Sequence, residues 1–186
     1  MKIVSLDPSI NETGWACLKG MERKDDRVWD DTNSDWSWGV FKLKGISLSY
    51  KLKELVEYMI MEFDGLDEED WLVVEWPQYF NQPRGQVSIM QGHLFNLAAI
   101  DTYVAGYFRL PPQNWFPITA PNWKGSVSKE ITRRRFFKAM GLPQIYKVNH
   151  NAVDAVMMLL EFARRKRITN RIISSAMSHL DSTETA

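Results

Sequence analysis

A long apolar segment near the end of the chain places the strongest constraint on the fold. Residues 152–163, AVDAVMMLLEFA, are apolar at nearly every position, and the charged run RRKR follows at 164–167. A helix that is apolar nearly all round must be covered nearly all round, so this helix, expected to begin near Asn149, must pack deep against a sheet. Asp154 lies inside the run and therefore needs a partner, because burying an unpaired carboxylate costs several kcal/mol.

The first half of the chain supplies most of the strands. Short apolar strands are predicted at 3–7, 14–19 and 36–44, and the turn residues SINETG join the first two as a hairpin. Apolar residues at helical spacing predict a helix over 48–63, and WLVVE at 71–75 predicts a fourth strand. Residues 20–35 are charged and are expected to form a connection or a mobile flap.

The second half alternates helices with one more strand. Helices are expected over 86–108, from Ser128 to residue 140 before Gly141, and from Asn149; NWFPIT at 114–119 is the fifth strand. This order favours an α/β fold, a mixed five-stranded sheet flanked by helices on both faces. We expect one domain over residues 1–167 and a polar C-terminal tail over 168–186.

The formal net charge of zero hides an asymmetry. Residues 1–80 contain 9 Lys/Arg and 17 Asp/Glu, whereas residues 81–186 contain 14 and 6. The second half can thus form a basic face for a polyanion. No signal-peptide pattern and no run of about 18 apolar residues occurs, so we expect a cytoplasmic protein without a membrane span. The single cysteine, Cys17, is expected to be buried and inert.

Three acids stand where such a fold delivers side chains to one edge of the sheet. Asp7 ends the first strand, Glu75 ends the fourth, and Asp154 lies early in the last long helix. Hydrolysis of a phosphodiester is promoted by two divalent ions about 3.5–4 Å apart, held by hard oxygen ligands. The acids therefore predict a site for two Mg²⁺ ions, which Mn²⁺ can replace, with Asp7 bridging. Singly, each acid also suits a turn, a strand end or a helix surface.

A fourth metal ligand is expected one helical turn before Asp154. Asn151 and His150 lie three and four positions earlier, on the same side of the helix. Asn151 offers a neutral carbonyl oxygen, whereas His150 offers a nitrogen that suits Mn²⁺ better and can shuttle protons. The sequence leaves both residues open as the fourth ligand.

Three short motifs, LDPSINETGWA, VVEWPQYF and HNAVDAV, resemble those of the RuvC-type Holliday junction resolvases, nucleases of the RNase H-like fold, and among them the phage members. The element order matches over residues 1–163. The resemblance implies that Asp7, Glu75 and Asp154 are catalytic metal ligands and that four-way DNA junctions are cut by paired incision. Asn151 departs from the family pattern, which usually has an acid or a histidine there.

The loop after Glu75, WPQYFNQPRGQ, contains residues that can stack on unpaired bases, and Arg84 adds a positive charge. In the family an aromatic just beyond this acid enters the junction centre, and the resemblance assigns that role to Tyr79 or Phe80. Packing inside the protein is the alternative for the aromatic residues of this loop.

Further DNA contacts are expected from a basic segment. Lys124 and Lys129 resemble family lysines that approach the cleaved phosphate, and lysine neutralises phosphate without reading sequence. Arg133 begins a run of three arginines that point in different directions, so one or two are expected to meet DNA. The resemblance also implies that the helix over 86–108 pairs two protomers into a homodimer, against the alternative of a monomer with a buried central helix.

Junction resolution has three competitors. A broader structure-selective nuclease acting on forks and flaps shares the fold and the acids. A catalytically weakened junction-binding protein is motivated by Asn151. An actin-like phosphotransferase is suggested by the turn DPSINETG, but the chain lacks further Gly-rich phosphate loops.

Overall fold

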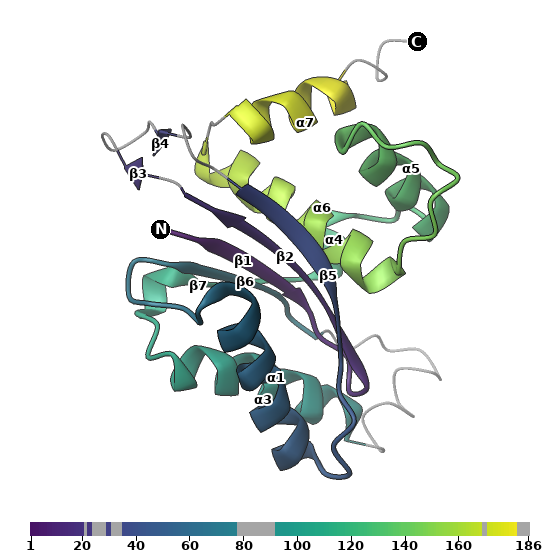
Figure 1. Ribbon diagram of the computed structural model, residues 1–186. Helices are drawn as coiled ribbons and strands as arrows, with labels where there is room; N and C mark the ends of the chain where they lie inside the picture. Colours follow the sequence, from purple (N-terminus) through teal and green to yellow (C-terminus); the bar gives the residue numbers. More distant parts are fainter. Residues whose placement is uncertain (21, 24–28, 31–34, 78–91, 169–170, 182–186) are drawn as a thin grey trace.

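A five-stranded sheet forms the centre of the protein (Figure 1). The computed structural model describes residues 1–181 except for 21, 24–28, 31–34, 78–91 and 169–170. The strand order is β5-β2-β1-β6-β7. The strands are β1 (Ile3–Asp7), β2 (Glu12–Lys19), β5 (Asp35–Lys42), β6 (Trp71–Glu75) and β7 (Trp115–Ile118).

The sheet is mixed, as predicted. β2 pairs antiparallel with both β1 and β5, whereas β6 pairs parallel with β1, and β7 parallel with β6. The three parallel strands therefore end at one common edge. Side chains alternate between the two faces along each strand, so Ile3 and Val73 face one core while Val4 and Leu72 face the other.

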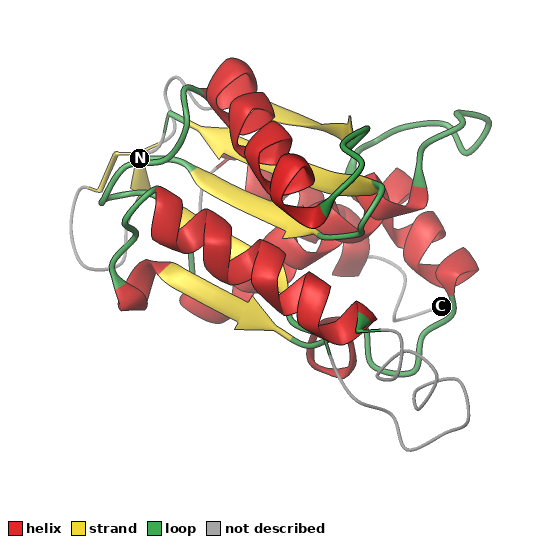
Figure 2. Cartoon of the chain, turned by 90° about the horizontal axis from the view of Figure 1, so that it is seen from below, coloured by secondary structure: helices red, strands yellow, loops and turns green. Residues whose placement is uncertain are grey.

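Helices cover both faces of the sheet (Figures 1 and 2). One face packs against α1 (Leu48–Phe63) and α3 (His93–Tyr107). The other packs against α6 (His150–Lys166), with α5 (Lys129–Ala139) and α7 (Arg171–Asp181) outside it. A 3₁₀ turn (Pro112–Asn114) precedes β7, and the short helix α4 (Ala120–Trp123) follows it. The predicted α/β architecture is confirmed.

The helix α6 is buried nearly all round, as its sequence predicts. Asn149 caps its first turn by accepting a hydrogen bond from the backbone N–H of Asn151 (2.9 Å). From β1, the buried hydroxyl of Ser5 donates to the carbonyl oxygen of Ala155 (2.6 Å). This bond fixes the height of α6 over the sheet.

The helix can approach β2 closely because residue 14 is glycine. A Cβ atom on Gly14 would lie 2.1 Å from the carbonyl carbon and oxygen of Asn151 and 2.7 Å from the nitrogen of Ala152. No side chain fits in that space. Gly14 therefore sets the distance between β2 and the first turn of α6.

The predicted polar tail over 168–186 was wrong for residues 171–181. These residues form α7, which places Ile173 and Ala176 in the core beside α5 and α6. Its apolar residues recur at helical spacing among many polar ones, so the overall polarity of the segment concealed one apolar face.

Two further segments were predicted less completely. Within residues 20–35, the two-residue strands β3 (Glu22–Arg23) and β4 (Trp29–Asp30) pair with each other. The predicted helix over 86–108 ends as expected, and its first residues lie outside the described part. Among the residues that the structure describes, none of the helices is both long and apolar enough to cross a bilayer.

Candidate functional site

Two of the predicted acids end neighbouring parallel strands. The paired register of β1 and β6 runs to Leu6 and Val74, and Asp7 and Glu75 come directly after these partners. Ser5 and Val73 face the α6 side of the sheet. Asp7 comes two positions after Ser5, and Glu75 comes two positions after Val73, so both acids face the same side. The topology therefore brings Asp7 and Glu75 to the same edge and the same face.

The third acid comes from α6 above that edge. Asp154 is buried, with 7% of its surface exposed, and the bond from Ser5 to Ala155 anchors the helix next to it. The charges of Glu75 and Asp154 both raise the pKa of Asp7, so the three acids are close enough to interact.

A lysine ammonium group lies between two of the acids. Lys124, directly after α4, places Nζ 3.1 Å from Oδ2 of Asp154 and 3.8 Å from Oε2 of Glu75. The indole nitrogen of the preceding Trp123 donates to the same oxygen of Glu75 (2.8 Å). Lys124 also lies 4.5 Å from the centre of the Trp123 ring. One cation thus contacts two carboxylates from different elements.

The positive charge of Lys124 does not bring the pKa values of Asp7 and Glu75 down to their ordinary values. Burial, followed by the charges of Glu75 and Asp154, holds the pKa of Asp7 well above its ordinary value, although Lys124 and Lys129 lower it. Burial also raises the pKa of Glu75, against the opposing effects of Lys124 and of the hydrogen bond from Trp123. An additional cation at this edge would stabilise the ionised carboxylates.

The donor chemistry at this edge fits a divalent cation, but the side chains are not arranged as the ligands of one. Carboxylate oxygens are the hard ligands that Mg²⁺ prefers. In the described ranges, however, no group of three His, Cys, Asp or Glu side chains is arranged to hold a metal ion. The ammonium group of Lys124 instead lies between Glu75 and Asp154. The two Mg²⁺ or Mn²⁺ ions remain a prediction.

The two candidates for the fourth ligand differ in their surroundings. His150 is exposed at the start of α6, whereas Asn151 is buried. The amide nitrogen of Asn151 lies 3.3 Å from Oε1 of Glu12, which also accepts a bond from Asn149 (2.9 Å). Asn151 is therefore held by β2. Glu12 is a carboxylate near the site that sequence reasoning missed, and its place at the start of a strand gave no signal of this contact.

The predicted basic residues Lys129 and Arg133 differ in their surroundings. Lys129 is exposed at the start of α5 and is close enough to lower the pKa of both Asp7 and Glu75. Arg133 donates to the carbonyl oxygen of Tyr146 (3.0 Å) and lies 5.3 Å from the ring centre of Phe137. Its side chain is thus engaged within the protein, and its contact with DNA stays a prediction.

The aromatic loop after Glu75 is described only at its start. Trp76 is half-buried and packs edge-on against Trp115, with ring centres 5.9 Å apart, so packing is the role that the structure shows for it. Tyr79, Phe80 and Arg84 lie outside the described residues.

A further acid, Asp101 on α3, was also missed. It is fully buried, and neither of its carboxylate oxygens has a hydrogen-bond partner among the described residues. Burial, followed by the charges of Asp7 and Glu75, raises its pKa well above the ordinary value. The signal was present: Asp101 is the one acidic residue in the apolar helix α3, and Asp154 likewise lies among apolar residues in α6.

The fold is similar to that of two solved structures. No family model and no curated protein matches the sequence. A solved structure of Thermus thermophilus RuvC in complex with a Holliday junction substrate matches with a TM-score of 0.56 at 14% identity, over 89% of this chain and 96% of that one. Another structure of Thermus thermophilus RuvC matches with a TM-score of 0.54 at 15% identity, over 90% and 96%. The predicted RNase H-like, RuvC-type fold is confirmed.

Proposed function

We propose that this protein is a metal-dependent endonuclease that resolves Holliday junctions by paired incision. One observation carries the proposal: three acids from β1, β6 and α6 converge at the carboxyl edge of a RuvC-type sheet, where Lys124 contacts two of them. The similar RuvC structure was solved with a Holliday junction substrate, which supports branched DNA as the ligand.

In this proposal each side chain has a defined task. Asp7, Glu75 and Asp154 hold the divalent ions, with His150 or Asn151 as the fourth ligand. When bound, such ions activate water and neutralise charge on the leaving oxygen. Lys124 exchanges a carboxylate contact for a phosphate oxygen, and Lys129 adds positive charge beside it.

A homodimer is part of the proposal, because a four-way junction has approximate two-fold symmetry and requires two cuts. The helix α3 supports this: Phe95, Tyr103 and Tyr107 expose 73%, 38% and 52% of their surfaces, and their spacing in multiples of four places them along one stripe. Sedimentation should give a dimer for the wild type and a monomer for Phe95→Glu. A wild-type monomer at all concentrations would contradict the dimer while leaving the site unaffected.

The decisive experiment compares Asp7→Asn with the wild type on labelled four-way junction, fork and duplex DNA in Mg²⁺ or Mn²⁺. The wild type should nick the junction on opposing strands, and Asp7→Asn should bind it without cutting. Asp35→Asn is the matched control and should cut normally. Asp35 is an exposed acid at the start of β5, where it is the strand partner of Lys19 on β2. Cutting by Asp7→Asn would refute the mechanism, whereas equal cutting of forks would favour the broader structure-selective nuclease.

A second candidate is a junction-binding protein with weakened cutting. Two contacts favour it, because each engages a predicted metal ligand with another protein group. The amide nitrogen of Asn151 bonds Glu12, and the ammonium group of Lys124 lies between Glu75 and Asp154. Calorimetry distinguishes the two: tight junction binding without heat from Mg²⁺ or Mn²⁺ would support the binding protein.

A further inference from the structure

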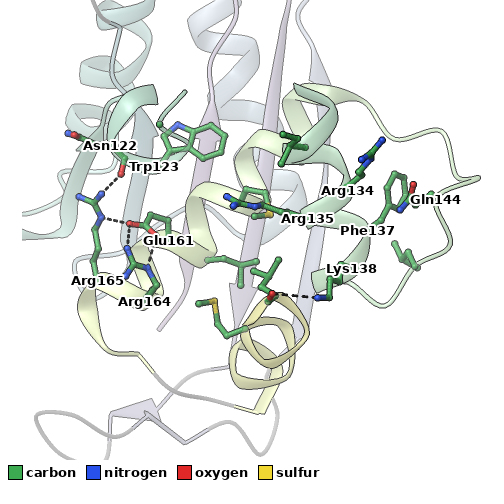
Figure 3. A pocket seen from close by; sticks show the side chains of 17 residues that line it. Asn122, Trp123, Arg134, Arg135, Phe137, Lys138, Gln144, Glu161, Arg164 and Arg165 are labelled. Carbon is green, nitrogen blue, oxygen red and sulfur yellow. Dashed lines mark hydrogen bonds and ion pairs between the residues drawn. The ribbon is translucent and has the colours of Figure 1, made fainter. Parts of the chain in front are cut away.

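A pocket of about 980 Å³ lies on the α6 side of the sheet, between α4, α5, α6 and α7 (Figure 3). Half-buried apolar side chains, among them Leu142, Met157 and Met177, form part of its lining. Its size is in the range of ligand-binding pockets, and the apolar part of its lining can accept a flat apolar group.

Basic side chains form another part of the lining. Arg134, Arg135 and Lys138 come from α5, and Arg164 and Arg165 come from α6 on the other side (Figure 3). Among the described lining residues the one acid is Glu161, which is bound by both arginines of α6, at 2.7–2.8 Å. The lining therefore has a clear excess of positive charge, which suits a ligand that combines a flat apolar group with negative charge.

The pocket and the acids share one face of α6. Met157 follows Asp154 by three positions and Glu161 follows it by seven, which places all three residues on the same side of the helix. Seven residues span about 10 Å along the helix, so one strand of DNA could reach both the acids and the pocket. α4 forms a second connection, because Trp123 lines the pocket while its indole nitrogen bonds Glu75.

We propose that this pocket receives a nucleotide of the cut strand close to the cleaved phosphate, with its base on Leu142 and Met157 and its phosphate at Arg134. The inference rests on the proposed nuclease function. An acidic peptide has similar chemistry, but continuity with the carboxylate cluster favours a nucleotide. Phosphate contacts of this kind position the strand, and the base contact adds a preference for unstacked nucleotides.

Binding to a fluorescent four-way junction in EDTA, at several salt concentrations, tests the charged part of the pocket without cleavage. Arg134→Glu should weaken binding about tenfold and lower the salt slope by about 1–2. Lys53→Glu, the same charge change on α1 across the sheet, should leave both values near those of the wild type. Equal losses in the two variants would show a general charge effect and overturn the pocket.

Photocrosslinking tests the position directly. A 5-iodouracil, placed in turn at each of the nucleotides next to the cut, should from one of these positions crosslink to peptides of α4, α5 or α6 that line the pocket, and Met157→Ser should lower the yield without changing the salt slope. Crosslinks to α1 or α3 instead, or equal competition by poly-glutamate and oligothymidylate, would overturn the inference. A wild type that binds no DNA would refute the proposed function itself, so the two failures are distinguishable.

Discussion

The ammonium nitrogen of Lys124 lies 3.1 Å from Oδ2 of Asp154, and both side chains are largely buried. The lysine comes from the turn after α4 and the acid from α6, so the contact joins two elements that are 30 residues apart in the chain. A buried carboxylate requires such a counter-charge. Lys124 therefore provides at this edge of the sheet part of the positive charge that a bound divalent ion would provide.

Replacing Lys124 by Met should destabilise the protein at neutral pH by about 1–3 kcal/mol, because Glu75 and Asp154 lose their shared cation. Mg²⁺ or Mn²⁺ should then raise the midpoint of thermal unfolding more in the variant than in the wild type, since the ion replaces the lost charge. Lys53→Met removes an exposed ion pair with Glu57 and should change stability by less than about 0.5 kcal/mol. Identical midpoints for Lys124→Met and the wild type would show that the contact contributes nothing.

Gly14→Ala should displace the first turn of α6. The new Cβ would overlap the backbone of Asn151, which a side-chain rotation cannot relieve, so we expect a loss of about 2–4 kcal/mol and loss of cutting, because Asp154 moves with the helix. Gly106→Ala is the control: its Cβ meets no atom within 4 Å, and alanine stabilises a helix by up to about 1 kcal/mol. Denaturant unfolding measures both changes, and an unchanged stability of Gly14→Ala would contradict the packing argument.

The strands, the long helices and the three acids were predictable because they depend on local patterns. The apolar run over 152–163 required a sheet to cover it, and a strand that ends on an acid delivers that acid to the sheet edge. Asp7, Glu75 and Asp154 follow from such reasoning, which needs only periodicity and the direction of each strand.

The partners of these acids were not predictable, because they depend on contacts between distant segments. The four residues of α4 are too few to show a period, so the place of Lys124 between two acids became visible only in the structure. The bond between Asn151 and Glu12 joins residues 139 positions apart. Periodicity describes which face of an element is buried and not which side chains meet there.

Cys17 should be inert in the folded protein. Burial raises the pKa of its thiol to about 12, so almost no thiolate forms near neutral pH. Thiol reagents should label it only as fast as the chain unfolds, and denaturant should accelerate labelling in proportion to unfolding. Rapid labelling under native conditions would show that β2 opens without global unfolding.

Asp101→Asn should stabilise the protein at pH 7 by about 1–3 kcal/mol. The raised pKa of Asp101 means that the folded state holds its proton more tightly than the unfolded state does. Stability from this group is therefore complete below the unfolded pKa of about 3.9 and is lost as the pH rises toward the folded value. Asparagine keeps the shape and polarity of aspartate but cannot ionise. The difference in unfolding free energy between the variant and the wild type therefore reports the cost of the buried charge.

The pH dependence separates this explanation from a simple packing effect. The gain from Asp101→Asn should be largest at neutral pH and should vanish near pH 4, whereas the exposed control Asp35→Asn should show little change at either pH. Chemical unfolding at a series of pH values measures the difference. A gain that is the same at every pH, or a variant less stable than the wild type at pH 7, would mean that Asp101 has an ionic partner in the folded protein. Because Asp7 and Glu75 contribute to the raised pKa, Asp7→Asn should also reduce the gain.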